Sequence, residues 1–256
     1  HGGGCDGNFT YHCKITNSAK PMNIVITGAS KGLGKAIAGR FAADGKAHQL
    51  FLCARTKHEL EATAEELRQR YPHAQVYTKT CDVSDKTDLT AFAEWVSGKA
   101  GKTDILVNNA GIYLPGSAYG EDDGNLESLM SVNVYSAYHL SRLLLPAMME
   151  ARSGHIFNMC SIASLNAYPN GGAYGISKYA LYGFSKNLRE EMKPYGIKVT
   201  HVLPGAAYTD SWSGSGIDPH RLMEASDIAE MVYAAAQLSP QACVEEIILR
   251  PQLGDL

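Results

Sequence analysis

Residues 27–34 read TGASKGLG, and this stretch stands directly between a β-branched run, NIVIT at 23–27, and an amphipathic helical pattern. Gly28 permits a tight turn, Gly32 lets the backbone approach a pyrophosphate, and Gly34 lets the helix pack near the strand. The N-terminus of that helix offers free N–H groups and the positive end of its dipole to an anion. Because strand, turn and helix follow in the required order, the stretch predicts a dinucleotide-binding turn rather than an ordinary strand–helix connection.

The rest of the chain repeats the alternation of short apolar runs and helical patterns. Several runs are almost continuously apolar, which is typical of strands buried on both faces of a parallel sheet. The predicted strands cover 23–27, 48–54, 76–83, 104–109, 155–161, 198–204 and 245–250. The predicted helices cover 33–44, 57–70, 86–100, 125–151, 173–194 and 226–238. The alternation predicts an α/β fold: a single-domain, doubly wound Rossmann fold whose seven-stranded, mostly parallel sheet carries helices on both faces.

The composition excludes several classes of protein. The 256 residues carry a net charge of −3, and 45% of them are hydrophobic. This near-neutral balance gives no electrostatic reason to expect a nucleic-acid partner or a membrane surface, and no apolar run is long enough to span a bilayer. Most cysteines lie in apolar runs and are interpreted as small buried hydrophobes in a reducing compartment, so a cytoplasmic location is expected. No metal site is expected.

Two parts are expected along the chain. Residues 1–22 have no periodicity and lack a positively charged start followed by an apolar core. They are interpreted as an N-terminal extension or expression remnant rather than a signal peptide. Residues 23–256 contain no Pro-, Gly- or Ser-rich linker, so they are expected to form one Rossmann-fold domain.

Two cations indicate which nicotinamide cofactor the turn binds. The second strand reads FLCAR and ends in Arg55 without an acid at its tip, where a carboxylate would bind the ribose hydroxyls of NAD. Lys31 lies inside the glycine turn. Two cations facing one site repel each other unless an anion joins them, and either one alone would be an ordinary solvated charge. The pair therefore predicts NADP(H) over NAD(H).

Further motifs follow the glycine turn in order. NNAG stands at 108–111 and PGAAYT at 204–209, and the turn itself has the spacing TGxxxGxG. Four single residues at matching positions are Asn133, Ser161, Tyr174 and Lys178. Together these motifs resemble the short-chain dehydrogenase/reductase family over nearly all of 23–256. The resemblance implies an NADP-dependent oxidoreductase that acts on an alcohol or carbonyl.

The family resemblance also implies a set of cofactor contacts at the carboxyl ends of the strands, where open α/β sheets bind ligands. The expected cofactor-binding residues are Gly28, Ser30, Lys31, Gly32, Leu33, Gly34, Arg55, Asp82, Val83, Asn109, Ala110, Gly111, Tyr174, Lys178, Pro204, Gly205, Ala207 and Thr209.

The same resemblance assigns catalytic roles. Hydride transfer to a carbonyl carbon leaves negative charge on the oxygen, which Tyr174 would bond and protonate. Lys178, one helical turn on, is expected to lower the tyrosine pKa and to bond the nicotinamide ribose. Ser161 would donate to the substrate oxygen, and Asn133 would hold a water for proton return. Each residue alone has an ordinary structural explanation, and so do the neighbouring tyrosines Tyr179 and Tyr182, which are interpreted as packing residues.

The substrate is expected to lie beneath a short glycine-rich loop at about 209–225. The expected substrate contacts are Tyr113, Ala163, Tyr168, Tyr208, Trp212 and Asp255. Aromatic walls favour a flat or ring-bearing carbonyl. The stretches GAAYTDSW and VEEIILRPQLGDL resemble bacterial sepiapterin reductases, which reduce a side-chain ketone on a pterin, and Asp255 could pair with pterin N–H groups or remain a solvated charge.

Alternative functions remain open from the sequence alone. One is a 3-oxoacyl reductase or another short-chain alcohol dehydrogenase or carbonyl reductase, because the catalytic residues serve both directions. Another is an inactive NADP-sensing or scaffold module, although such proteins usually lose the tyrosine or the lysine. In the family the helices at 125–151 and 173–194 commonly pair across a two-fold axis, so a homodimer or homotetramer is expected.

Overall fold

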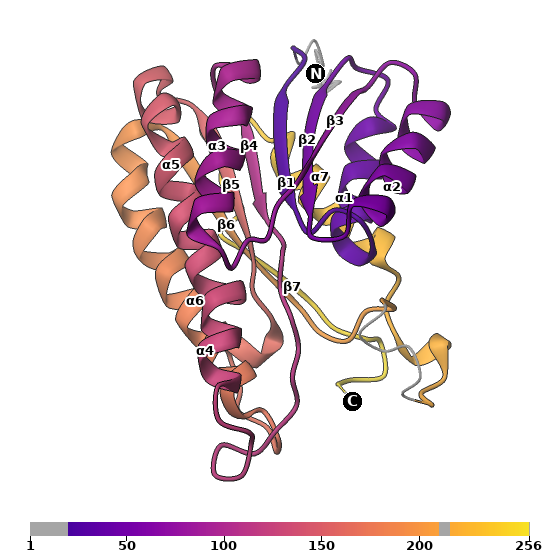
Figure 1. The fold of residues 1–256 in the computed structure, drawn as a ribbon, viewed down its shortest axis with the longest axis vertical. Coiled ribbons are helices and arrows are strands. Elements are labelled where there is room, and N and C mark those ends of the chain that lie inside the picture. Colours follow the sequence, from indigo (N-terminus) through magenta and orange to yellow (C-terminus); the bar gives the residue numbers. More distant parts are fainter. Residues whose placement is uncertain (1–19, 210–215, 256) are drawn as a thin grey trace, which may run out of the picture.

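The strands of a computed structural model, which describes residues 20–209 and 216–255, form one sheet in the order β3-β2-β1-β4-β5-β6-β7 (Figure 1). They are β1 (Asn23–Thr27), β2 (Gln49–Ala54), β3 (Gln75–Thr80), β4 (Ile105–Asn108), β5 (Gly154–Met159), β6 (Ile197–Pro204) and β7 (Glu246–Leu249). Neighbouring strands in this order are all paired parallel, so the doubly wound fold is confirmed and "mostly parallel" becomes fully parallel. The order reverses direction between β1 and β4, and such a switch point is where open α/β sheets bind ligands.

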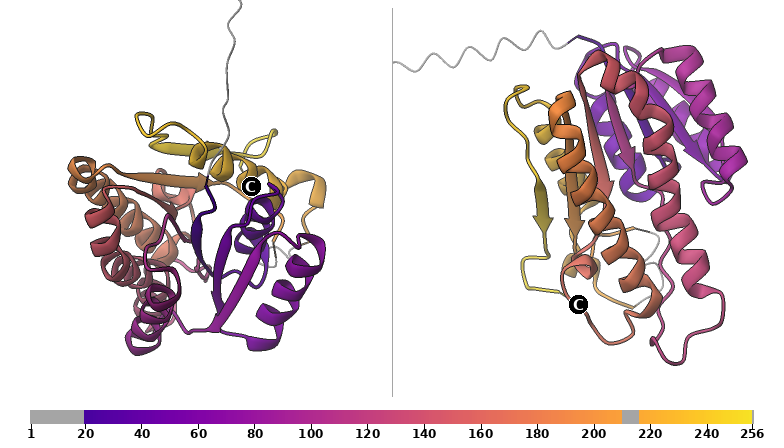
Figure 2. Two further views of the ribbon diagram at one scale, coloured as in Figure 1. Left: turned by 90° about the horizontal axis from the view of Figure 1, so that it is seen from above. Right: turned by 90° about the vertical axis from the view of Figure 1, so that its left-hand side faces the viewer.

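Helices cover both faces of the sheet (Figures 1 and 2). They are α1 (Gly32–Ala42), α2 (Lys57–Arg70), α3 (Lys86–Ala100), α4 (Asn125–Met130), α5 (Ser136–Ala151), α6 (Gly172–Met192) and α7 (Ala225–Ala236). Side chains alternate along β1: Ile24 and Ile26 pack in a core with α1, α2 and α7, whereas Val25 packs in a second core with α3, α5 and α6. Both sides of the strand are buried, which explains its continuously apolar sequence.

The structure corrects two predicted strand ends near the site. β3 ends at Thr80 rather than at 83, and β5 ends at Met159 rather than at 161. After β5 the chain turns into a short 3₁₀ helix at Ile162–Ser164, because Ser161 accepts a hydrogen bond from the amide of Ala163 at 3.1 Å and caps that turn. Polar groups that bond their own backbone favour such turns over a ladder.

The long helix predicted at 125–151 is divided. α4 and α5 are joined by one π-helical turn at Ser131–Tyr135, in which Asn133 is buried. Such turns add a residue to the helical repeat and occur often at functional sites. The periodicity of the sequence did not reveal this turn.

A buried polar ladder ties the ends of β4 and β5 to the helices. The Asn108 side chain donates to Asn158 Oδ1 at 2.8 Å and to Ser141 Oγ on α5 at 3.0 Å. Asn158 in turn donates to Ser185 Oγ on α6 at 2.8 Å. All four side chains are buried, and their bonds hold the ends of β4 and β5 against α5 and α6.

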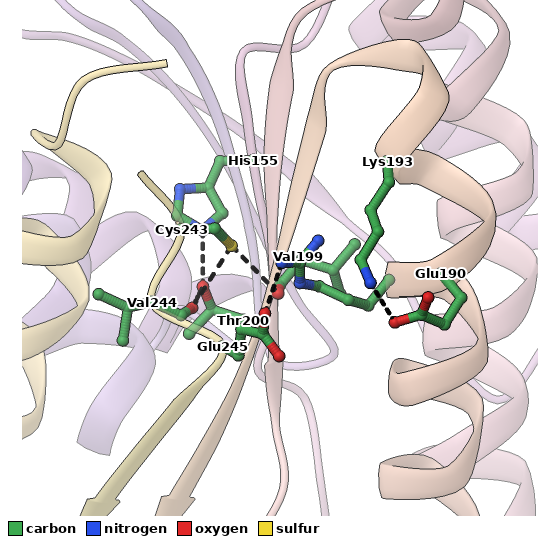
Figure 3. Close-up of polar contacts among 9 residues, drawn as sticks. His155, Glu190, Lys193, Val199, Thr200, Cys243, Val244 and Glu245 are labelled. Carbon is green, nitrogen blue, oxygen red and sulfur yellow. Dashed lines mark hydrogen bonds and ion pairs between the residues drawn. The ribbon is translucent and has the colours of Figure 1, made fainter. Parts of the chain in front are cut away.

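A second polar contact fastens β5, β6 and the segment before β7 (Figure 3). Thr200 Oγ1 donates to the carbonyl of Val244 at 2.6 Å and lies 2.7 Å from His155 Nε2. Because the threonine proton is engaged, the imidazole supplies the proton of the second bond. Burial lowers the pKa of His155 to about 3, so this histidine is neutral at physiological pH and acts as a structural donor.

Candidate active site

The glycine turn after β1 is built so that only glycine fits at two of its positions. Gly28 has a φ of 64°, and a Cβ there would lie 2.9 Å from the Cα of Ala110. A Cβ on Gly34 would lie 2.3 Å from the carbonyl oxygen of Gly28. Gly34 therefore acts through close helix–strand packing, as predicted, and the turn leaves room for an anion at the start of α1.

The NNAG segment at 108–111 meets this turn. The Asn109 side chain donates to the carbonyl oxygens of Thr27 at 2.8 Å and Gly28 at 3.1 Å. Thr27 Oγ1 accepts the amides of Asn109 and Ala110. The NNAG segment after β4 is thereby bonded to the end of β1, and the switch point between these strands is closed by side chains of both.

A cavity of about 340 Å³ lies at the carboxyl edge of β1, β2 and β4. Twelve of the expected cofactor residues line it: Gly28, Ser30, Lys31, Gly32, Leu33, Arg55, Asp82, Val83, Asn109, Ala110, Gly111 and Thr209. α1 begins here without a side-chain hydrogen bond from its N-cap residue, Lys31. The N–H groups of its first turn are thus available to an anion from the cavity, which fits the phosphates of a dinucleotide.

The far end of this cavity carries charges of both signs. Asp82 accepts hydrogen bonds from the amide and hydroxyl of Ser84 at 2.9 and 2.7 Å. These bonds, together with the nearby charge of Arg55, lower the pKa of Asp82. Glu59 on α2 also lines the cavity. Arg55, which directly follows the last residue of β2, supplies the positive charge at this end of the cavity, as its position in the sequence predicts.

A second cavity of about 440 Å³ adjoins the first. Both cavities are lined by Leu33, Asn109, Gly111, Ile112 and Thr209. The second contains Ser161, Tyr174 and Lys178 together with the expected residues Pro204, Gly205 and Ala207. The structure thus brings three of the four proposed catalytic side chains into a cavity that adjoins the cavity of the glycine turn.

Ser161 and Lys178 are held in different ways around Tyr174. Ser161 Oγ accepts the amide of Ala163, and the Ser161 hydroxyl is also bonded to Tyr174. Lys178 Nζ donates to the carbonyl of Met159 at 2.9 Å and lies 5.8 Å from the centre of the Tyr174 ring. α6 places the tyrosine and lysine on one face, and the turn after β5 places the serine opposite them.

The protonation equilibria differ from the expected tuning of Tyr174 by Lys178. Burial raises the pKa of Tyr174 above its usual range, and a hydrogen bond from Ser161 acts in the opposite direction. Burial lowers the pKa of Lys178 to about 8. In the protein without a bound cofactor the loss of solvent therefore sets the direction of the Tyr174 pKa, and a lowering of this pKa by Lys178 stays a prediction for the complex.

Asn133 lies behind the cavity and does not line it. Its side chain accepts the amide of Ile112 at 2.8 Å and donates to the carbonyl of the same residue at 3.1 Å. It also donates to Ser177 Oγ at 3.0 Å, beside Lys178. Asn133 Oδ1 and Lys178 Nζ both lie close to Gly111. A Cβ added at Gly111 would lie 3.2 Å from the oxygen and 3.7 Å from the nitrogen.

Four of the expected substrate residues line the second cavity. They are Tyr113, Ala163, Tyr168 and Asp255. The ring of Tyr113 stands edge-on to Tyr174, with centroids 4.8 Å apart. The carboxylate of Asp255 is paired with Arg250 in the tail that follows β7.

The other aromatic residues predicted near the site are placed differently. Tyr208 is exposed and is not among the residues that line either cavity. Trp212 lies outside the described residues. Tyr182 donates to Glu246 on β7 and stacks edge-on to His201, while Tyr179 is exposed. Tyr182 therefore packs as expected, whereas Tyr179 is too exposed to be a packing residue.

Several lining residues were missed by the sequence analysis. In the second cavity they include Ile112, Met159, Cys160, Ile162, Asn166 and Ala206. Most of them directly precede or follow a predicted residue at a strand end, so the predicted motifs were too short by one residue. Asn166 carried no local signal; with its amide oriented to satisfy both partners, its oxygen accepts from Arg250 at 3.3 Å.

The described ranges, 20–209 and 216–255, meet neither the requirements of a metal site nor those of a membrane-spanning helix. No three His, Cys, Asp or Glu side chains there are grouped so that they could hold a metal ion. No helix in the same ranges has the length and apolar character needed to cross a membrane.

Comparison with known proteins identifies the family of this site. The sequence pattern of the family described as short chain dehydrogenase matches residues 22–218. This chain belongs to the short-chain dehydrogenase family. The short-chain dehydrogenase fold, its glycine turn and its Ser–Tyr–Lys constellation therefore occur together here, and the chain is assigned to the oxidoreductases of that family.

Individual short-chain dehydrogenases resemble the chain along most of its length. The sepiapterin reductase of Chlorobaculum tepidum is 34% identical over 91% of this chain and 97% of the reductase. The crystal structure of a metagenomic short-chain oxidoreductase in complex with NADP is 31% identical, with a TM-score of 0.79 over 91% of this chain and 98% of that one. An alcohol dehydrogenase from Thermococcus sibiricus, complexed with 5-hydroxy-NADP, is 28% identical, with a TM-score of 0.84 over 91% and 97%.

Proposed function

We propose that the protein is an NADP(H)-dependent reductase of a small carbonyl compound, with Tyr174 as the acid. One observation carries the proposal: Ser161, Tyr174 and Lys178 converge on a cavity that adjoins the cavity of the glycine turn. When bound, the nicotinamide supplies or accepts the hydride. The chain itself has to bind the cofactor, orient the carbonyl and move one proton.

The residues around the first cavity fit a dinucleotide. The first turn of α1 and the close approach at Gly28 suit the pyrophosphate. Arg55 and Lys31 suit the 2′-phosphate that distinguishes NADP from NAD, and the similarity to structures solved with NADP supports this assignment. The segment from Pro204, the last residue of β6, to Thr209, which lines both cavities, would hold the nicotinamide end.

The proton steps follow from the three polar groups. With substrate bound, Ser161 turns its hydroxyl proton from Tyr174 to the carbonyl oxygen and so stabilises the charge that develops there. Tyr174 is protonated at neutral pH, because its pKa is raised, and therefore donates its proton to the same oxygen as the alcohol forms. Lys178, with a pKa of about 8, is mainly protonated at neutral pH and stabilises the phenolate that remains. Asn133 holds the backbone of Ile112 and bonds Ser177, the neighbour of Lys178.

Replacing Arg55 with alanine is expected to weaken NADPH binding about 10- to 100-fold, since a charge-assisted hydrogen bond to a phosphate contributes about 1.5–3 kcal/mol. The affinity for NADH should change by less than about twofold. Fluorescence titration of both nucleotides measures this. Lys57→Ala is the matched control, because Lys57 is also exposed but does not line the cavity. NADH binding to the wild type as tightly as NADPH would contradict the cofactor assignment.

The preferred substrate class is a pterin with a side-chain ketone, or a related small diketone. The similarity to a bacterial sepiapterin reductase supports it, as do the aromatic walls formed by Tyr113 and Tyr168. Asp255 offers a carboxylate at the edge of the cavity, and Gly205 leaves room for it, since an added Cβ would lie 3.4 Å from Asp255 Oδ1. The pairing with Arg250 means that substrate N–H groups would share or replace an existing partner.

NADPH oxidation with sepiapterin is therefore expected for the wild type, and Asp255→Asn should lower kcat/KM for sepiapterin about tenfold, because it replaces a charged hydrogen-bond acceptor with a neutral one. 2,3-Butanedione has no ring N–H groups for Asp255 to bind, so its kcat/KM should change less than twofold in the same variant. A screen across pterins, diketones, steroids, sugars and acyl thioesters gives the comparison. Turnover of diketones without any turnover of sepiapterin would reject the pterin class and retain the carbonyl reductase.

Two other functions are distinguished by the same screen. A 3-oxoacyl reductase or another alcohol dehydrogenase would use the same residues, and a preference for acyl thioesters or for NADP-linked alcohol oxidation would indicate it. An inactive NADP-binding sensor or scaffold would bind NADPH without turnover of any carbonyl. The intact Ser161, Tyr174 and Lys178 favour an enzyme.

The organisation of the chain is proposed on the same basis. Residues 23–256 would form the reductase domain and 1–22 an extension, with the loop at about 209–225 above the substrate; the ends of this loop meet where Tyr208 donates its amide to Met223 at 2.7 Å. Exposed apolar side chains on α5 and α6, including Leu143 and Ile176, support a homo-oligomer. Buried free cysteines such as Cys53 and Cys81 support a cytoplasmic location.

A further inference from the structure

The connection between β4 and α4 is bonded to the first turn of α6, the helix that carries Tyr174. The carboxylate of Glu121 in this connection lies 3.0 and 3.2 Å from the amide nitrogen of Ala173, which donates to it. Ala173 directly precedes Tyr174. The acceptor therefore comes from a residue 52 positions earlier in the chain.

α6 has no cap of its own at this end. Its N-cap residue is Gly171, which has no side chain, and no acidic residue occurs in the first turn of the helix. The first N–H groups of a helix have no partner within it, and a negative charge there is favoured by the helix dipole. Glu121 supplies both the acceptor and the charge.

The backbones of the two segments also touch. The amide of Gly116 donates to the carbonyl of Asn170 at 3.2 Å. A Cβ on Gly172 would lie 2.3 Å from the carbonyl oxygen of Gly116 and 2.9 Å from Glu121 Oε2. Gly172, with a φ of 30°, thus allows the connection to lie directly on the start of the helix.

An aromatic contact continues this junction into the cavity. Tyr113, from the same connection, stands edge-on to the Tyr174 ring with an interplanar angle of 88°. Tyr168, just before α6, forms a side-chain hydrogen bond with Tyr113. The backbone before Tyr174 and the ring of Tyr174 are therefore both held by the segment 113–121.

We propose that Glu121 is a positioning residue, which fixes the first turn of α6 and thereby the hydroxyl of Tyr174 relative to Ser161. The proposal rests on the function given above in so far as Tyr174 is the acid. Glu121 does not line the cavity, so it acts on the reaction through the helix and not by touching the substrate. Small misplacements of a reacting group reduce turnover strongly while binding is retained.

Steady-state kinetics of three variants test this role, with NADPH and either sepiapterin or 2,3-butanedione as the probe. We expect Glu121→Ala to lower kcat at least tenfold, with the KM of the carbonyl and the Kd of NADPH changed less than twofold. Glu121→Gln retains an acceptor for the Ala173 amide and should recover at least half of the wild-type kcat. Asp123→Ala removes an exposed carboxylate of the same connection and should match the wild type. An unchanged kcat in Glu121→Ala would overturn the proposal.

Amide hydrogen exchange provides a test that does not depend on turnover. Exchange across 173–178 should quicken at least tenfold in Glu121→Ala and remain at the wild-type rate in Glu121→Gln and Asp123→Ala. Gly172→Ala should quicken the same amides because its Cβ meets Gly116, whereas Gly183→Ala, in the same helix with nothing within 4 Å, should not. If no carbonyl is reduced by the wild type, the proposed function fails, and unchanged exchange in Glu121→Ala would still refute the positioning role separately.

Discussion

Tyr174→Phe is expected to lower kcat at least about 1,000-fold, near the upper part of the 10²–10⁴-fold range of general acid catalysis. The phenylalanine ring keeps the packing against Tyr113 but has no proton for the carbonyl oxygen. Because Tyr174 lines the second cavity and not the one at the glycine turn, the Kd of NADPH should change by less than about threefold. Rapid-quench or steady-state kinetics with the best carbonyl from the screen, together with nucleotide titration, measure both quantities.

Tyr179→Phe is the matched control for this variant. Tyr179 lies in the same helix but is 45% exposed, so loss of its hydroxyl should leave kcat within about twofold of the wild type. Wild-type turnover by Tyr174→Phe would show that another group protonates the substrate. An equal loss in both variants would show that the effect comes from the helix as a whole.

Lys178→Met is expected to remove most activity and at the same time to stabilise the protein without cofactor. Burial lowers the pKa of Lys178 to about 8 from an ordinary 10.5, so the folded protein holds an ammonium group that solvent would stabilise better. At pH 7, burial of this ammonium group lowers the free energy of unfolding by an amount on the order of 3 kcal/mol. The hydrogen bond to the Met159 carbonyl offsets about 1 kcal/mol of that loss. Methionine has a similar length and no charge, so the free energy of unfolding should rise by about 1–3 kcal/mol.

The pH dependence of the unfolding free energy gives the sign of this effect. Between pH 8 and 10.5 the folded wild type has released the Lys178 proton that the unfolded chain still binds, so stability from this residue rises with pH across that window. Below pH 8 the penalty is present in full. Lys178→Met should lose this rise, whereas Lys186→Met, an exposed lysine of the same helix, should keep it. Urea unfolding from pH 6 to 10 separates the two outcomes, and a destabilised Lys178→Met at pH 7 would show that the charge is already compensated.

The strands and helices were largely predictable because their signals are local. Apolar runs and helical periodicity depend on residues a few positions apart, and the predicted strands all occur in the sheet. The signal of the glycine turn is equally local, because the glycines lie within eight consecutive residues between a strand and a helix. Errors arose where a side chain bonds the backbone: at Ser161, which caps a turn rather than extending β5, and at the π-helical turn around Asn133.

The site was predictable in its members but not in its energetics. Tyr174 and Lys178 could be paired from a spacing of four residues, because the helix repeats at nearly that interval. Whether the charge of the lysine or the loss of solvent decides their pKa values depends on how deeply both are covered, and the cover comes from other elements. The pairing of Asp255 with Arg250 is likewise set by how the tail folds back over Gly205.

The amino-acid sequence by itself determined the order of strands and helices, the dinucleotide turn and the identity of the polar residues at the strand ends, because these depend on periodicity, chain conformation and chemistry within short segments. Only the tertiary structure decided that Glu121 caps the helix of Tyr174, that Asn133 faces the backbone of Ile112, and that burial controls the proton equilibria of Tyr174 and Lys178. Each of these depends on segments that lie far apart in the chain, and only the packing of those segments sets the distance and the dielectric surroundings between them.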